Sequence, residues 1–299
     1  MPQTFKEYLT EQRQQVDTAL DALLPSDETY PSVIHESMRY SVFAGGKRLR
    51  PILVLMTAEM LGHKPSSAIL AAAAAIEMVH TYSLIHDDLP AMDNDDLRRG
   101  RPTNHKVYGE DIAILAGDAL LTLAFQILAD PRHAEHCAPS ALLAAIHELG
   151  YAAGTRGMVG GQAMDMQAER RVIDPQELDY IHTHKTAKLI TAALRMGAVL
   201  ASAAPEQLAA VTTYGESIGL AFQIVDDILD LEGNAAELGK NTRSDLHRHK
   251  ATYPAMYGIG PSKTKAQHLI QNAKQSLQMF GERAYYFSKL ADFIQSRTH

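Results

Sequence analysis

The apolar positions of this chain recur mainly at the three- and four-residue spacing of α-helices. Runs that alternate apolar and polar residues between hairpin-type turns are missing from the sequence, so strands are not expected. The pattern predicts helices over residues 51–61, 67–86, 111–129, 138–152, 174–197, 206–232 and 263–281. Short turns rich in glycine, proline and serine separate them. We therefore predict an all-α fold in which residues 1–299 form a single domain.

The nearest approach to a membrane span in the sequence is the apolar stretch of residues 112–129. It contains Gly117, Asp118 and Gln126, and an aspartate at the centre of a spanning helix costs about 2.5–3.5 kcal/mol. We therefore expect a buried helix of a bundle, and no membrane anchor.

Composition excludes several classes of partner and location. The net charge of -7 argues against a nucleic-acid partner, because domains that bind nucleic acid usually carry a basic surface. A single cysteine, Cys137, cannot form an internal disulfide, which fits a reducing compartment. Its neighbours His133 and His136 do not complete a zinc ligand set, so this segment is expected at the surface. The start of the chain lacks the apolar core of a signal peptide, and we expect a cytoplasmic protein.

Five aspartates lie in the ten-residue stretch 87–96, and arginines follow shortly after it. The first three acids, Asp87, Asp88 and Asp93, have the spacing DDxxxxD. On an unbroken helix Asp87 and Asp93 would lie about 120° apart. They converge only if the chain bends after Asp88, and Pro90 allows such a bend.

A second acidic cluster, Asp226, Asp227 and Asp230, interrupts an apolar helical pattern. Asp226 and Asp230 lie one turn apart on the same face, so both can bind one ion. An all-oxygen donor set favours Mg²⁺, which takes one or two carboxylates and completes its shell with water and phosphate oxygens. Two such clusters predict several divalent cations and an anion such as diphosphate held between them.

Basic residues that suit this anion occur at four places. The turn AGGKRLRP precedes a helix whose first N–H groups also favour anions. Arginines follow the first acidic cluster, and their planar guanidinium groups match phosphate oxygens. The basic residues concerned, with the threonine that accompanies one of them, are Lys47, Arg48, Arg50, Arg98, Arg99, Lys185 with Thr186, Lys240 and Lys250.

Together these motifs resemble those of the trans-isoprenyl diphosphate synthases along nearly the full chain. The matching stretches are GGKRLRP, SLIHDDLPAMDNDDLRRGRPTNH, GDALL, GGQAMD, HKTAKLI and FQIVDDILD. The resemblance implies an isoprenoid synthase-type bundle of about ten or more helices around a deep central cavity, usually in a homodimer. It implies that isopentenyl diphosphate is condensed with dimethylallyl and then geranyl diphosphate, and the fifteen-carbon (2E,6E)-farnesyl diphosphate is the expected product.

The resemblance also implies a role for individual positions. The implied metal ligands are Asp87, Asp88, Asp93, Asp226, Asp227 and Asp230. The implied isopentenyl diphosphate site comprises Gly46, Lys47, Arg50, His80 and Arg99. The implied allylic diphosphate site comprises Arg98, Lys185, Thr186, Gln223 and Lys240. Of these, the implied catalytic residues are Asp87, Asp88, Asp93, Arg98, Lys185, Asp226 and Asp227. Three Mg²⁺ ions are expected with substrate bound, and Mn²⁺ is an expected substitute.

The expected chemistry needs no nucleophilic side chain. Magnesium and arginine charges would stabilise the departing diphosphate, so that the allylic C–O bond ionises and isopentenyl diphosphate attacks the cation. The final proton is expected to pass to the released diphosphate. Product length should depend on the helix that carries Asp87, where Ser83 lies one turn before it and the ring of Tyr82 is adjacent.

Several alternatives stay open from the sequence. A geranylgeranyl or geranyl diphosphate synthase of the same family would share these motifs. A metal phosphohydrolase of HD type would use His86 and Asp87 with His80 and His105, but it leaves the second acidic cluster unexplained. A terpene cyclase has little need for a second diphosphate site, so the stretch GGKRLRP argues against it. A non-catalytic partner subunit tends to lose one acidic motif, whereas both are intact here.

Overall fold

The computed structural model describes residues 3–135, 137–169, 171–232 and 252–296. Nearly all of their regular structure is helical, which confirms the predicted all-α class. The chain divides into two compact units, Met1–Leu55 with Lys64–Ile146 and Met56–His63 with His147–His299. Two of the three boundaries fall within α3 (Leu49–Met60) and α7 (Pro139–Ala153), and the third lies in the turn after α3. The single domain expected from the sequence stays a prediction.

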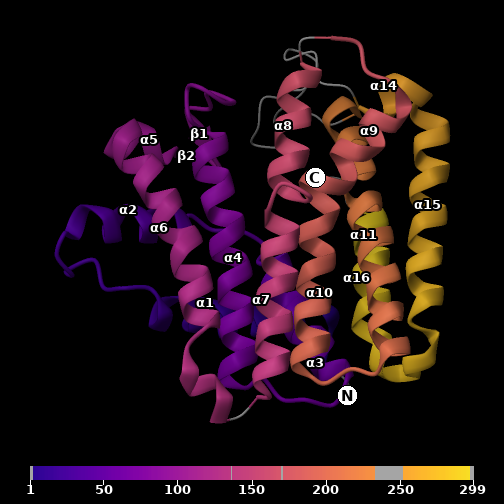
Figure 1. The fold of residues 1–299 in the computed structure, drawn as a ribbon. Helices are drawn as coiled ribbons and strands as arrows, with labels where there is room; N and C mark the ends of the chain where they lie inside the picture. The colour runs from indigo at the N-terminus through magenta and orange to yellow at the C-terminus, as the bar shows by residue number, and fades with distance from the viewer. Residues whose placement is uncertain (1–2, 136, 170, 233–251, 297–299) are drawn as a thin grey trace. The chain divides into compact units, whose positions relative to one another are not determined.

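The first unit is built around α4 (Ser67–Asp87), which packs against α6 (Glu110–Leu128) and α1 (Phe5–Leu23). Figure 1 shows α4 and α6 side by side. The other elements of this unit are α2 (Ser32–Val42), β1 (Leu97–Arg98), β2 (Arg101–Pro102), α5 (Asn104–Tyr108) and the 3₁₀ helix η1 (Pro131–Glu135).

The sequence of α4 explains where the helix begins and why it is central. Ser66 caps the N-terminus by accepting a hydrogen bond from the N–H of Ile69 at 3.4 Å. The alanines at 71–75 are at most 1% exposed, and their small side chains let neighbouring helices approach closely. The helix ends at Asp87, one residue beyond the predicted end, with Pro90 shortly after.

Only one side of α6 is buried, which corrects the expectation of a buried helix over residues 112–129. An added Cβ at Gly117 would lie 2.1 Å from Nε2 of His86, so α4 crosses α6 closely at this glycine. On another face Ile114 and Leu115 are 45% and 54% exposed. By length and composition alone α4, α6 and α11 (Pro205–Glu232) are apolar enough to cross a membrane.

The second unit is built around α11, which packs against α10 (Lys188–Leu200) and α15 (Ile259–Ser276). Its other elements are α8 (Met158–Ala168), α9 (Pro175–Ile181), α14 (Tyr253–Tyr257), the 3₁₀ helix η3 (Gln278–Ala284) and α16 (Tyr285–Ser296). The sequence predicts one helix over residues 174–197. The structure instead joins α9 to α10 through a π-helical segment, η2 (His182–Ala187), whose wider turn leaves little trace in the apolar periodicity.

A short antiparallel hairpin, not expected from the sequence, connects α4 to α5. Its strands pair Leu97 with Pro102 and Arg98 with Arg101. At the turn, Arg99 and Gly100 have φ values of 54° and 76°, the positive values that two-residue hairpin turns favour. Strands of two residues are too short to produce a recognisable alternation, which is why the sequence pattern missed them.

Candidate active site

The first acidic motif lies where α4 ends. Asp87 is the last residue of the helix, Asp88 follows as its cap, and the chain then turns back. The N–H of Asp93 donates to the carbonyl of Asp87 at 2.8 Å, and the N–H of Asp95 donates to the carbonyl of Asp88 at 3.2 Å. The bend predicted at Pro90 is therefore present, and it brings Asp93 back beside Asp87.

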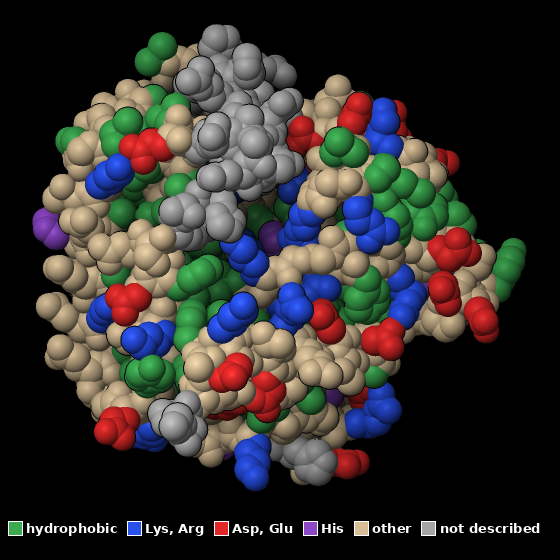
Figure 2. All heavy atoms as spheres, turned by 180° about the vertical axis from the view of Figure 1, so that it is seen from behind, with side chains coloured by type: hydrophobic (Ala, Val, Ile, Leu, Met, Phe, Trp, Pro, Cys, Tyr) green, Lys and Arg blue, Asp and Glu red, His purple; other side chains and the backbone are tan. Residues whose placement is uncertain are grey.

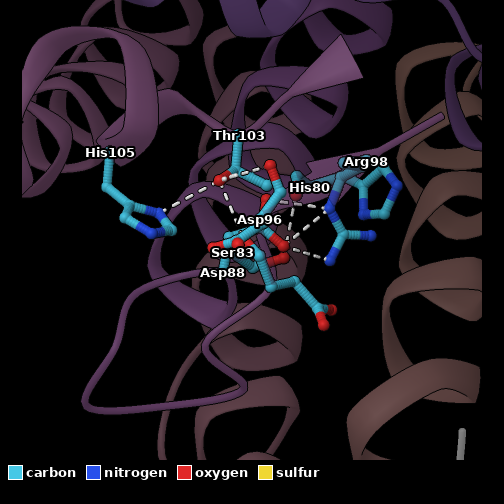
Figure 3. A network of polar contacts seen from close by, with 8 residues as sticks. His80, Ser83, Asp88, Asp96, Arg98, Thr103 and His105 are labelled. Atoms are coloured by element: carbon cyan, nitrogen blue, oxygen red, sulfur yellow. Dashed lines mark hydrogen bonds and ion pairs between the residues drawn. The ribbon is translucent and has the colours of Figure 1, made fainter. Parts of the chain in front are cut away.

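Asp88 is bound by Arg98 of the hairpin, as Figure 3 shows. The aspartate is 3% exposed, and each carboxylate oxygen accepts a hydrogen bond from Arg98 Nε at 2.9 Å. A further bond runs from Nη2 at 2.5 Å. Burial raises the pKa of Asp88, and the hydrogen bond from Arg98 partly offsets that rise. Burial lowers the pKa of Arg98, but the bond to Asp88 and the neighbouring aspartate charges together outweigh burial and leave this pKa raised. Asp88 thus orients Arg98 from a buried position. Asp87 and Asp93 are less buried than Asp88.

The hairpin that carries the arginines is itself fixed in the first unit. The Thr103 hydroxyl donates to the carbonyl of Asp95 at 2.7 Å, and His105 Nδ1 lies 3.2 Å from the same hydroxyl (Figure 3). Tyr40 on α2 donates its O–H to the carbonyl of Pro102 at 2.8 Å. These contacts give the arginines a rigid support.

The glycine turn before α3 determines where Arg99 lies. Gly45 and Gly46 have φ values of 88° and 135°, which glycine adopts at little cost. Arg99 donates a hydrogen bond to the carbonyl of Gly45. A Cβ at Gly46 would lie 2.6 Å from Nη1 of Arg99, so a side chain at this position would displace the guanidinium. Lys47 follows and is exposed.

The two remaining arginines near this turn differ in their surroundings. Arg48 is 5% exposed and donates to Glu77 Oε1 at 2.9 Å, Asp17 Oδ1 at 2.8 Å and the carbonyl of Val42 at 2.7 Å. Nε of Arg50 is buried and has no hydrogen-bond partner among the described residues. Burial lowers the pKa of Arg50 to about 10, and the charge of Glu77 opposes the shift. Arg48 is therefore structural, and Arg50 presents a buried donor suited to an anion.

A cavity in the first unit is lined by several of these groups. It encloses about 460 Å³ of empty space, its open mouth included, and is bordered by Glu77 and His80 of α4, by its cap Asp88, and by Arg98 and Arg99. Burial and the neighbouring arginines lower the pKa of His80, so its ring is neutral near pH 7. On the face shown in Figure 2, lysine and arginine side chains gather in one region beside hydrophobic side chains. The guanidinium groups that line the cavity are of the kind that suits a phosphate-type anion.

The residues expected to set product length lie on α4. Tyr82 is 7% exposed and packs edge-to-face against His86, with ring centroids 5.8 Å apart. The Ser83 hydroxyl donates to the carbonyl of His80 at 2.8 Å. These contacts show how both side chains pack, and their influence on product length stays a prediction.

In the second unit the central acid of the second motif is buried. Asp227 is 3% exposed, and its Oδ1 accepts a hydrogen bond from Nε2 of Gln223 at 3.0 Å. Its Oδ2 accepts the N–H of Tyr253 at 3.0 Å and lies 3.4 Å from Nε2 of His182. Burial lowers the pKa of His182 to about 4, so this ring is neutral at physiological pH.

The π-helical segment η2 carries two of the predicted allylic-site residues. Nζ of Lys185 lies 2.7 Å from Oδ2 of Asp165, and the Thr186 hydroxyl donates to Oε1 of Gln223 at 3.0 Å. An added Cβ at Gly161 would lie 2.2 Å from the backbone nitrogen of Lys185, so this glycine lets α8 approach η2. Lys185, Thr186 and Gln223 therefore come together within the second unit.

The remaining carboxylates fit magnesium in kind and number. Asp87 with Asp93, and Asp226 with Asp230, form pairs that are only partly buried. Across the described ranges, no three His, Cys, Asp or Glu side chains form a cluster able to hold a metal by themselves. Mg²⁺ does not need such a cluster, because substrate phosphates and water complete its shell. Each carboxylate pair therefore suits a Mg²⁺ ion that binds together with a diphosphate.

The histidines that suggested other metal chemistry have other contacts. His86 Nε2 lies 3.0 Å from the carbonyl of Ile114, which removes the basis for an HD-type phosphohydrolase. His133 was expected at the surface, but it is 8% exposed and its Nε2 lies 2.9 Å from the carbonyl of Ile127. That expectation is wrong for His133, because η1 folds its ring against α6. The other predicted positions Lys240, Lys250 and His136 lie outside the described residues.

Some residues of the site were not identified from the sequence. Glu77 and Asp165 each pair with a basic residue, and their signal was a single acid in the helical stretches AAAAAIEMVH and GGQAMD. The contact of His182 and Tyr253 with Asp227 had no sequence signal, because it joins positions 26 and more residues apart in chain order.

The fold and these contacts define a class of protein, namely an all-α protein with two aspartate-rich motifs and an arginine-lined cavity. The family model for polyprenyl synthetase matches residues 31–286, and the chain belongs to this family.

Individual relatives agree with this membership. The chain is 47% identical over 294 residues to a dimethylallyltranstransferase of Fischerella ambigua (strain UTEX 1903), covering 98% of this chain and 84% of that protein. It is 45% identical over 296 residues to a farnesyl diphosphate synthase of Geobacillus stearothermophilus, covering 99% of both. It is also 45% identical to a chloroplastic geranylgeranyl pyrophosphate synthase of Capsicum annuum, covering 99% of this chain and 79% of that protein.

A solved structure shows the same fold. The crystal structure of a putative farnesyl-diphosphate synthase from Marinomonas sp. MED121 matches with a TM-score of 0.85 and 40% identity, covering 98% of this chain and 100% of that one. The isoprenoid synthase-type fold predicted from the sequence is confirmed.

Proposed function

We propose that this protein is a farnesyl diphosphate synthase, which condenses isopentenyl diphosphate with dimethylallyl diphosphate and then with geranyl diphosphate. The observation that carries the proposal is the presence of two acidic motifs and an arginine-lined cavity in a member of the polyprenyl synthetase family. A geranylgeranyl diphosphate synthase is the second candidate, because a relative of that name is equally similar. The buried ring of Tyr82, five positions before Asp87, favours the fifteen-carbon product.

The proposed substrate sites use the groups gathered in each unit. In the first unit, the residues that hold isopentenyl diphosphate are Gly46, Lys47, Arg50, His80 and Arg99. Of the residues that we assign to the allylic diphosphate, Arg98 belongs to the first unit, and Lys185, Thr186 and Gln223 belong to the second. Lys240, assigned to the same substrate, lies outside the described residues. The hydrogen bond that Arg98 donates to Asp88 supports the assignment of Arg98, because it fixes the direction of the guanidinium.

The proposed reaction proceeds by ionisation, condensation and elimination. Bound Mg²⁺, three ions per site with Mn²⁺ as a substitute, would supply positive charge to the departing diphosphate. In the first unit Asp87 and Asp93 would hold such ions, with Asp88 in support. In the second unit Asp226 and Asp230 would do so, with Asp227 in support.

The side chains do not themselves form covalent bonds with the substrate. The allylic C–O bond would break with its electron pair on the diphosphate, whose charge basic side chains assigned to this substrate would stabilise. The double bond of isopentenyl diphosphate then forms the new C–C bond, and a proton leaves to the released diphosphate. The oxygens of Thr186 and Gln223, which share a hydrogen bond, offer partial negative charge to the cation.

We further propose a cytoplasmic homodimer without a membrane anchor. Ile114 and Leu115 expose apolar surface on α6, and burial of such surface against a second copy would stabilise a dimer.

Replacement of single motif aspartates tests the proposed function. Asp87→Ala or Asp226→Ala should lower turnover by about 10³-fold or more, since each removes a carboxylate that holds the charge-stabilising ions. Circular dichroism should show that folding is retained. Asp96→Ala is the matched control, because its carboxylate pairs with the exposed Lys106 at 3.0 Å, and it should keep normal turnover. Near-normal turnover in either motif variant would exclude the assigned role.

A further inference from the structure

The π-helical segment η2 occupies a central place in the second unit. It carries Lys185 and Thr186, and it packs against α8, α9, α10 and α11. Glycines let two of these helices approach it, because an added Cβ at Gly161 or Gly219 would lie 2.2 Å from the nitrogen of Lys185 or 2.5 Å from Cβ of Ala187. A π-helical turn has poorer hydrogen-bond geometry than an α-helix and needs support from its surroundings.

His182, the first residue of η2, is almost completely buried. It is 5% exposed, and its ring stacks on Tyr253 with centroids 5.2 Å apart and planes inclined by 26°. Nε2 lies 3.4 Å from Oδ2 of Asp227, whereas Nδ1 has no hydrogen-bond partner among the described residues. The contact with Asp227 is therefore the polar interaction that orients the ring.

The same carboxylate also reaches the other end of η2. Oδ1 of Asp227 accepts a hydrogen bond from Gln223 at 3.0 Å, and Oε1 of Gln223 accepts the hydroxyl of Thr186 at 3.0 Å. Asp227 is thus connected to the first residue of the segment through one oxygen and to its fifth residue through the other. Few arrangements of the segment satisfy both connections, so they fix its register along α11.

We propose that His182 is a positioning residue, which through Asp227 holds η2 in the register that places Lys185 and Thr186 beside Gln223. The proposal rests on the proposed function, since it assigns these three residues to the allylic diphosphate site. It gives Asp227 a specific task, which is to bridge α11 and η2. Because Nδ1 lacks a partner, the ring proton must lie on Nε2 to point at the carboxylate.

The competing explanation is that His182 only fills space against Tyr253. Substitutions that keep either the shape or the donor distinguish the two roles. His182→Phe keeps a flat ring for stacking and removes the donor, whereas His182→Gln replaces the ring and keeps a donor that can reach Asp227.

The same segment offers a matched control. His184 lies two residues further along η2, stacks on Tyr180 with centroids 3.7 Å apart, and has Nδ1 2.8 Å from the Tyr180 carbonyl. Among the described residues, no hydrogen bond, ion pair or ring contact joins His184 to Asp227, Gln223 or Thr186. His184→Phe therefore makes the same chemical change in the same segment without touching the proposed connection.

Steady-state kinetics provide the first test. His182→Phe should lower kcat about tenfold, which is the size of loss typical when a residue that positions a substrate-binding group is removed. KM for isopentenyl diphosphate should stay unchanged. His182→Gln should stay within about twofold of the unmodified protein, as should His184→Phe. Equal kcat for His182→Phe and the unmodified protein, or equal losses in the Phe and Gln variants, would overturn the proposal.

Nitrogen NMR provides a second test that needs no substrate, metal or turnover. In protein labelled with ¹⁵N-histidine at pH 7.5, the His182 signals are identified by their loss in His182→Gln. They should show a neutral ring protonated at Nε2, and a proton on Nδ1 would overturn the proposal. If the unmodified protein has no condensation activity, the proposed function fails, but this readout still decides how His182 is oriented.

Discussion

A single buried carboxylate, Glu77, controls the charge balance beside the cavity of the first unit. It is 3% exposed, and its partner Arg48 is 5% exposed. A buried charge that loses its partner cannot recover its hydration, so such pairs are costly to break. Glu77 thus holds Arg48 within the fold, and Arg50 and Arg99 are left for the isopentenyl diphosphate that we propose as their ligand.

Breaking this pair should destabilise the protein strongly. Glu77→Gln should lower the free energy of unfolding by about 3 kcal/mol, because it removes the buried counter-charge of the Arg48 guanidinium and leaves only the more exposed Asp17. Asp17 is the other carboxylate bound to Arg48, and its side chain is 41% exposed. Asp17→Asn should therefore cost about 1 kcal/mol or less. Chemical denaturation of both variants measures the difference. Equal costs would mean that burial does not determine the contribution of each carboxylate.

The ring of Tyr82 leads to a prediction about product length. Tyr82→Ala should shift the product from fifteen toward twenty carbons, because removal of the ring opens space along α4. Tyr82→Phe keeps the ring and should keep the fifteen-carbon product. Chromatographic sizing of labelled products compares the two variants, and an unchanged profile in Tyr82→Ala would exclude this ring as the limit.

At the scale of elements, close contact at glycine determines how the helices near the site pack. Gly117 accommodates His86 of α4, and Gly161 accommodates the backbone of η2. A methyl group at these positions overlaps atoms that cannot move away easily, backbone atoms in the case of Gly161. The elements that carry Asp87 and Lys185 thus depend on residues that have no reactive group.

Substitution of one such glycine should displace η2. Gly161→Ala should lower the free energy of unfolding by about 1–3 kcal/mol and reduce turnover, because the new Cβ overlaps the nitrogen of Lys185. Gly260→Ala in α15 is the control, since its Cβ would meet no atom within 4 Å. It should be neutral or stabilising by up to about 1 kcal/mol. Thermal unfolding and activity distinguish the two variants, and a harmless Gly161→Ala would contradict the close contact.

Local sequence patterns were sufficient to predict some elements and not others. The ends of α4, α6 and α11 lie within one residue of the predictions, because long apolar runs and turn residues mark them. The bend at Pro90 was predicted because proline restricts the residue before it. The π-helical segment and the hairpin were missed, because they depend on what packs against them.

The acidic motifs show the same limit at single positions. Their spacing identified all the aspartates, but it could not show that Asp88 and Asp227 are buried while Asp87 and Asp226 are more open. The partners that bind Asp88 and Asp227 include Arg98, ten positions away, and Tyr253, which is 26 positions away. Such contacts follow from the fold rather than from the local sequence.

At the scale of the whole molecule, the apolar surface of α6 leads to a prediction about assembly. Light scattering should give twice the 32.8 kDa of one chain if α6 is covered by a second copy. Leu115→Glu should shift the protein toward the monomer, because it places a charge in the interface. Val172→Glu, at a position that is 95% exposed in the second unit, should leave the dimer intact. A monomer at all concentrations of the unmodified protein would contradict the proposed assembly.

The central claim is that this member of the polyprenyl synthetase family elongates allylic diphosphates to fifteen carbons. The most direct measurement incubates the purified protein and Mg²⁺ with labelled isopentenyl diphosphate and dimethylallyl, geranyl or farnesyl diphosphate in turn, and then sizes the products. We predict farnesyl diphosphate from the first two substrates, little elongation of the third, and no product when the metal is chelated. A failure to elongate any of the three would contradict the account, and a predominantly twenty-carbon product would replace farnesyl with geranylgeranyl diphosphate as its product.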